Sequence, residues 1–126
     1  MKFITPTSLP TPAGHYSPGV VTNNLLFVSG QLPVNQDGTH NFTEPFEIQA
    51  RLAMRNLLEV VRTAGAELTG IVKVNVYIVG GDYWSEFNQL YAAIMGDHKP
   101  ARAVIPVPEL HHGYLVEIEA VVELSR

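Results

Sequence analysis

The chain has 126 residues, 46% of them hydrophobic and 16% charged, with a formal net charge of −4 and no cysteine. This length and composition predict one globular domain, residues 1–126, built around a single core. The missing cysteines exclude disulfides, thiolate catalysis and cysteine-bound zinc. Only eight basic residues are scattered along this acidic chain, which argues against broad electrostatic binding of nucleic acid.

No apolar run approaches the roughly 18 residues of a membrane-spanning helix, and residues 1–6 lack the long apolar region of a signal peptide. We therefore expect a cytoplasmic protein that does not bind membranes. Residues 1–15 contain three prolines and Gly14. This composition predicts an irregular, extended lead-in without a helix.

A β-hairpin is expected after the lead-in. Residues 20–22 and 25–29 are rich in β-branched and apolar side chains, and Asn23-Asn24 between them suits the left-handed backbone of a two-residue turn. The second strand ends at Ser29-Gly30-Gln31, where glycine permits another chain or a ligand to approach the backbone. Taken alone, the Ser29 hydroxyl is more simply explained as bonded to the backbone.

The first helix is indicated by apolar residues that recur every three to four positions between Phe46 and Ala64. Thr43 or Glu44 is its expected N-terminal cap, and Gly65 is expected to end it.

A strand over residues 71–79 and a second helix should follow. The strand has one apolar face, formed by Val72, Val74, Val76 and Ile78. The helix is expected to be capped by Asp82 and to end at Gly96. Its inner stripe consists of Phe87, Leu90, Tyr91 and Ile94. Asn88 lies near the middle of this helix, where a single amide most often faces water.

The last stretch carries an arginine and two carboxylates among apolar residues. Arg102 lies in a strand expected over residues 101–107, and Glu117 and Glu119 lie in a strand expected over residues 115–124, on the face away from its apolar side chains. Such charges need partners if they are buried. One interpretation is a structural ion pair at a sheet edge or subunit contact. The other is a site in which Arg102 holds an anionic group and a glutamate handles protons or water.

A metal site is not expected. His111 and His112 lie in the turn between these two strands, where adjacent side chains point in different directions. No further ligands cluster with them in sequence.

The order strand, strand, helix, strand, helix, strand, strand predicts an α+β fold with both helices on one side of a sheet. The other face of the sheet would remain partly apolar, which is typical of a surface that oligomerises.

Several short motifs occur together in this order. They are Gly14-His15-Tyr16-Ser17, Phe27-Val28-Ser29-Gly30-Gln31-Leu32-Pro33, Asn56-Leu57-Leu58, Ala64-Gly65-Ala66, Val72-Lys73-Val74, Phe87-Asn88 with Tyr91, Pro100-Ala101-Arg102 and Val116-Glu117-Ile118-Glu119-Ala120. Through these motifs the chain resembles the RidA (YjgF/YER057c/UK114) family of enamine/imine deaminases, from about Gly14 to Val122.

The resemblance implies a chorismate-mutase-like fold, a mixed sheet with two helices on one face, and a homotrimer with active sites between subunits. It implies that Arg102 binds the carboxylate of a 2-aminoacrylate-type substrate and that Glu117 positions or activates water. Tyr16, Ser29 and Asn88 match the remaining lining positions. The products would be a 2-keto acid and ammonia, and no cofactor would be needed.

Two other functions stay open. One is a non-catalytic trimer that binds small carboxylates through Arg102, and the other is ribonuclease or translation-inhibitor activity. The acidic charge and the lack of an evident His/Lys phosphate-cleaving arrangement disfavour the latter. The chain departs from the family pattern at His15, Pro18 and Val104 and at residues 110–112. These departures leave Arg102 and Glu117 in place, so they bear on the identity of the substrate.

Overall fold

Six strands form one mixed sheet in the computed structural model, which describes residues 1–124. The strands are β1 (Lys2–Ile4), β2 (Gly19–Thr22), β3 (Leu25–Gln31), β4 (Ile71–Val79), β5 (Ala101–Val107) and β6 (Val116–Glu123). Their order across the sheet is β1-β2-β3-β6-β4-β5. The β4–β5 pair is parallel and the other pairs are antiparallel.

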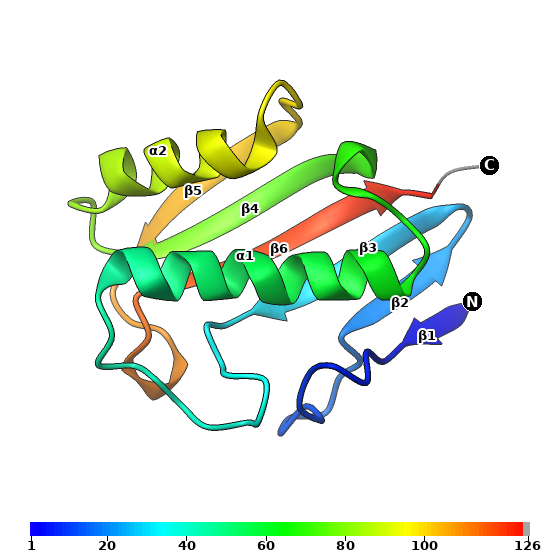
Figure 1. Cartoon of the computed structure of the whole chain (residues 1–126), viewed down its shortest axis with the longest axis horizontal. Coiled ribbons are helices and arrows are strands. Elements are labelled where there is room, and N and C mark those ends of the chain that lie inside the picture. Colours follow the sequence, from blue (N-terminus) through cyan, green and yellow to red (C-terminus); the bar gives the residue numbers. More distant parts are fainter. Residues whose placement is uncertain (125–126) are drawn as a thin grey trace.

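Both helices lie on the same face of the sheet (Figure 1). Helix α1 (Phe46–Thr63) crosses β6 and β3, and α2 (Trp84–Met95) lies beside β4 and β5. Short 3₁₀ turns occupy Leu68–Gly70 and His111–Gly113. The predicted α+β architecture with two helices on one side is therefore confirmed.

The core lies between the helices and the covered face of the sheet. The predicted stripe of α1 is buried, including Ala50, Leu57 and Val60, and it packs on alternate residues of β3, β4 and β6. Alternation along β6 buries Val116 and Ile118 completely. Residues between them therefore point to the uncovered face of the sheet.

The predicted hairpin forms with the expected turn. Asn23 and Asn24 adopt φ angles of 48° and 63°, the left-handed conformation that asparagine tolerates better than most residues. Along β3 the pairing register with β6 shifts between Val28 and Gln31. This irregularity falls at Ser29-Gly30, where the sequence predicted that another chain or a ligand could approach the backbone closely.

Three local expectations were wrong. Residues 1–15 are not irregular throughout, because β1 pairs with β2 and buries Ile4. The N-terminal helix caps also differ: α1 begins after Pro45 and α2 after Tyr83, and neither has a side-chain cap. Proline fixes a φ angle that suits a helix start, so α1 begins without a capping hydroxyl or carboxylate.

The third error concerns the start of β4. Val72 was expected to share the buried face with Val74, but Val72 is 47% exposed and Ile71 is buried. The pairing of β4 with β6 shifts between Ile71 and Lys73. An inserted residue of this kind reverses the alternation on one side of the bulge.

Within residues 1–124, no helix combines the length and the apolar character needed to cross a membrane.

Candidate active site

Arg102 lies on the edge strand β5, on the face that the helices cover. It pairs in register with Val74, which is fully buried on that face. One guanidinium nitrogen donates a hydrogen bond to Oδ1 of Asn88, at 2.9 Å. The guanidinium carbon lies 5.0 Å from the ring centroid of Tyr91 and 6.0 Å from that of Trp84. The half-buried cation is therefore held by one amide and two aromatic rings.

Helix α2 supplies all three of these contacts. Trp84, Asn88 and Tyr91 are spaced by four and three residues, so they share one helix face. The sequence favoured an Asn88 amide that faces water, but its side-chain oxygen accepts a hydrogen bond from Arg102. The Tyr91 hydroxyl is buried and has no hydrogen-bond partner among residues 1–124, and its burial raises the pKa of the phenol.

No carboxylate contacts Arg102 in the described part of the chain. Its guanidinium has five N–H donors, and one is engaged by Asn88. The ion pairs formed within residues 1–124 are Arg51–Glu47 and Arg62–Glu59 on α1. The structural ion pair considered for Arg102 is therefore absent from the single chain, and donors remain for an anionic group.

Glu117 lies on the opposite, uncovered face of the sheet. It pairs with Tyr77 of β4, between the buried residues Val116 and Ile118. Its carboxyl group packs against Gly30, and a β-carbon at that position would overlap it. Glycine is therefore required there for this placement of the carboxylate.

The surroundings of Glu117 favour its neutral form. Burial raises the pKa of the carboxyl group, because desolvation disfavours the charged state. The neighbouring charge of Glu119 also raises this pKa, while His111 lowers it. Glu117 and His111 line the same shallow groove at the turn before β6.

Ser29 and Tyr16 lie beside Gly30. The Ser29 hydroxyl donates to the carbonyl oxygen of Ser17 at 2.6 Å, and its amide donates to the carbonyl oxygen of Pro18 at 2.9 Å. The expected backbone-bonded hydroxyl is thus present, and it holds the segment that carries Tyr16 against β3. Tyr16 is 54% exposed, and it lines a cavity together with Gly30.

Glu119 differs from Glu117 although both lie on the uncovered face. Its Oε1 accepts hydrogen bonds from the Tyr77 hydroxyl at 2.6 Å and from the Asn75 amide at 3.3 Å. The bond to Glu119 raises the pKa of Tyr77 to about 12. Glu119 is therefore engaged within the sheet, whereas no hydrogen bond to Glu117 forms within residues 1–124.

The predicted site residues form two groups that do not meet within one chain. Asn88 and Arg102 lie on the covered face, whereas Tyr16, Ser29 and Glu117 cluster around Gly30. Strands β5 and β6 lie on either side of β4, so they are about 9.5 Å apart across the sheet. Along the strands, Arg102 is level with Val74 of β4 and Glu117 is level with Tyr77, a difference of three residues or about 10 Å. The two positions are therefore about 14 Å apart in the sheet and on opposite faces.

Two neighbours of the site were missed from the sequence. Trp84 could have been found, because it shares the three-to-four-residue spacing of Asn88 and Tyr91. The sequence marks His111 as a turn residue within a departure from the family pattern, and its position beside Glu117 depends on how the turn folds. In the described residues, no group of three or more His, Asp or Glu side chains is placed to hold a metal ion.

The sequence matches the family model described as endoribonuclease L-PSP over residues 6–124. The chain belongs to this family, the RidA/YjgF family. It is 31% identical to the 2-iminobutanoate/2-iminopropanoate deaminase of Dermatophagoides farinae over 124 residues, covering 98% of this chain and 97% of that protein. The predicted family resemblance is thereby confirmed.

Solved structures of RidA/YjgF proteins have the same fold. The YjgF gene product of E. coli superimposes with a TM-score of 0.90 and 31% identity, covering 98% of each chain. E. coli TdcF, solved with bound serine, gives a TM-score of 0.92 and 29% identity, covering 99% of this chain and 100% of that chain. The fold implied by the sequence motifs is therefore confirmed over the whole domain.

Proposed function

We propose that this RidA/YjgF protein hydrolyses reactive 2-imino acids to 2-keto acids and ammonia, at clefts between the subunits of a homotrimer. The observation that carries the proposal is the position of the two groups on opposite faces of the sheet. If a second copy of the chain brought its Arg102 beside Glu117 of the first, the two groups of residues together would form one complete site. One chain alone cannot provide this arrangement.

Arg102 suits the substrate carboxylate. Its planar guanidinium can form paired hydrogen bonds with a carboxylate, which fixes orientation as well as position. Asn88 and Tyr91 hold the guanidinium from the helix side and leave donors for the substrate. The substrate would be bound by its carboxylate, with its C=N carbon directed toward Glu117.

The proposed role of Glu117 is to act on the water molecule that attacks the imine carbon. An enamine first tautomerises to the imine, whose carbon is already electrophilic. Ionised Glu117 orients the water and accepts a proton as the C–O bond forms, and the nitrogen takes up protons before it leaves as ammonia. The raised pKa of Glu117 lies closer to neutrality than that of an exposed glutamate, which favours proton exchange in both directions. These steps need positioning and proton transfer, and neither requires a metal or an organic cofactor.

The uncovered sheet face suits a subunit interface. It exposes Phe27 and Ile105, at 44% and 37% of their surfaces, next to the polar network of Tyr77 and Glu119. A sheet face that contacts only water usually carries polar side chains, so exposed apolar side chains of this size are typical of an interface. Association of three copies through this face would place residues of one chain beside the next.

The relatives support this function at different levels. One is named a 2-iminobutanoate/2-iminopropanoate deaminase, and the serine-bound TdcF structure contains an amino acid with a carboxylate. A trimer that binds small carboxylates without catalysis is the second candidate, because Arg102 alone would suffice for it. The ribonuclease named in the family description is less favoured, since the chain carries a formal net charge of −4.

The test couples the protein to a serine or threonine dehydratase and measures the rate of keto acid and ammonia release. The intact protein should accelerate release, and Arg102→Ala should abolish the acceleration while the trimer persists by light scattering. Arg102→Lys should restore part of it, because lysine keeps the charge without the planar fork.

Glu117→Gln separates the two candidates. Loss of turnover with retained binding of 2-keto acids supports the deaminase. Saturable keto acid binding without turnover by the intact protein would support the binding trimer instead. A monomeric intact protein that still accelerates release would refute the inter-subunit site.

A further inference from the structure

A cavity of about 260 Å³ lies next to the Glu117 half of the proposed site. It lies between the lead-in at residues 9–18, the segment that follows β3 and the turn before β6, and it is partly open to solvent. The lining is mostly apolar or aromatic and includes Leu9, Pro12, Tyr16, Leu32, Val34 and His112. No Lys, Arg, Asp or Glu side chain is among its lining residues in the described part of the chain.

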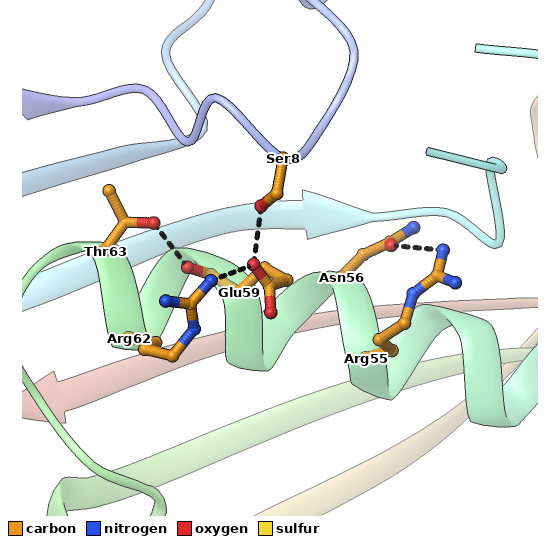
Figure 2. Close-up of polar contacts among 6 residues, drawn as sticks. All are labelled: Ser8, Arg55, Asn56, Glu59, Arg62 and Thr63. Atoms are coloured by element: carbon orange, nitrogen blue, oxygen red, sulfur yellow. Dashed lines mark hydrogen bonds and ion pairs between the residues drawn. The ribbon is translucent and has the colours of Figure 1, made fainter. Parts of the chain in front are cut away.

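Hydrogen bonds hold two walls of this cavity to helix α1. The Ser8 hydroxyl donates to the carboxylate of Glu59, which fixes the lead-in over the helix (Figure 2). The buried Asn56 amide donates to the carbonyl oxygens of Leu32 and Val34, each at 2.9 Å. The lead-in and the segment after β3 are therefore tied to the same helix.

The third wall consists of stacked imidazole rings. The centroids of the His40 and His112 rings are 4.0 Å apart, and the ring planes are inclined to each other by 28°. Nδ1 of His40 lies 2.8 Å from the hydroxyl oxygen of the fully buried Tyr114, within hydrogen-bond distance. An aromatic surface thus forms this side of the cavity, and the contact with Tyr114 holds the His40 ring.

The cavity adjoins Glu117 through two shared residues. Gly30 lines the cavity and is also the residue against which the Glu117 carboxyl group packs. His112 lines both the cavity and the groove that contains Glu117. A substrate whose imine carbon lies beside Glu117 can therefore extend past Gly30 into this space.

We infer that this cavity receives the side chain of the imino acid, and that the preferred substrates carry an apolar side chain of leucine or phenylalanine size. The inference rests on the proposed deaminase function. A cavity of about 150 Å³ is enough to bind benzene, so this larger space accommodates a phenyl or isobutyl group. An acidic or basic side chain would lose part of its hydration without a Lys, Arg, Asp or Glu partner in the lining, which disfavours such substrates.

The experiment compares imines made by an L-amino acid oxidase, with catalase present, from alanine, leucine and phenylalanine. Hydrolysis replaces the C=NH group by C=O, with water consumed and ammonia released. The kcat/KM values for the leucine and phenylalanine imines should exceed that for the alanine imine by about tenfold or more. Values equal to or below that for the alanine imine would overturn the inference and leave the deaminase function standing. Failure to hydrolyse any of the three would count against the deaminase function itself.

Variants that fill the cavity test its location. Ala13→Phe places a ring in the cavity from an exposed lining position, and Thr11→Trp does so from a second position if the first variant is unstable. Each should lower the ratio of kcat/KM for the phenylalanine imine to that for the alanine imine by about tenfold. Thr7→Phe, in the same lead-in but outside the cavity, is the matched control and should leave the ratio unchanged. An unchanged ratio in both cavity-filling variants would refute the assignment.

Discussion

The glycine beneath Glu117 offers the most direct test of the proposed chemistry. In Gly30→Ala, the new β-carbon would lie 2.9 Å from Cδ and 3.3 Å from Cγ of Glu117, and closer still to Oε2. Ordinary contact begins at 3.4 Å, so Cδ must retreat by 3.4 − 2.9 = 0.5 Å and the oxygen by more than that. The carboxylate is the flexible end of a side chain, so it will move while the strands keep their positions.

The expected loss is in kcat. Displacing a catalytic group by about 1 Å can reduce the rate about 100-fold, and we expect a loss of this order for Gly30→Ala. The free energy of unfolding should not fall by a corresponding amount, because an alanine that fits the backbone reduces the entropy of the unfolded chain. KM should change less than kcat, because in the proposed cleft the substrate carboxylate is bound by Arg102 of the neighbouring subunit and not by Glu117.

The assay is steady-state keto acid release from an imine-generating oxidase or dehydratase, with urea unfolding and light scattering on the same samples. Gly81→Ala is the matched control, because nothing lies within 4 Å of the β-carbon that it adds. A Gly30→Ala protein with the wild-type kcat would show that the position of the Glu117 carboxylate does not matter. The role proposed for Glu117 would then be wrong.

Three further predictions concern groups around the two half-sites. If turnover needs ionised Glu117, kcat/KM should rise as the pH rises through the raised pKa of this carboxyl group. The His111→Gln variant removes an interaction that lowers this pKa, so the acid limb of its pH–rate profile should move to higher pH. Asn56→Leu leaves the carbonyl oxygens of Leu32 and Val34 without their donor, so urea unfolding should show a loss of about 2 kcal/mol. Tyr91→Leu removes the ring 5.0 Å from the Arg102 guanidinium and should raise KM for the imine more than it lowers kcat.

Patterns that repeat along the sequence predicted most of the fold. Alternation in β6 placed Glu117 and Glu119 on the face away from Val116 and Ile118, and the structure confirms it. The asparagine pair identified the hairpin turn, and the apolar stripe identified α1. These features are local, so side-chain chemistry and spacing are enough to predict them.

Features set by pairing across the sheet were not predictable in the same way. Strand β1 has only three residues and gains its stability from β2, and the bulge at the start of β4 depends on how that strand meets β6. Strand β5 lacks a clear apolar alternation, because Arg102 and Pro106 interrupt it. The sequence therefore could not show that Arg102 faces the helices while Glu117 faces away.

This separation leads to a test that needs both half-sites. If Arg102 of one copy serves Glu117 of the next, Arg102→Ala and Glu117→Gln chains co-assembled in equal amounts will form some intact clefts. A cleft is intact when its arginine comes from a Glu117→Gln chain and its glutamate from an Arg102→Ala chain. Random mixing gives this combination in about one quarter of clefts, so about a quarter of wild-type activity should return. Each variant alone should remain inactive. If the mixed trimers are as inactive as the single variants, both residues act within one chain, and the inter-subunit site is refuted.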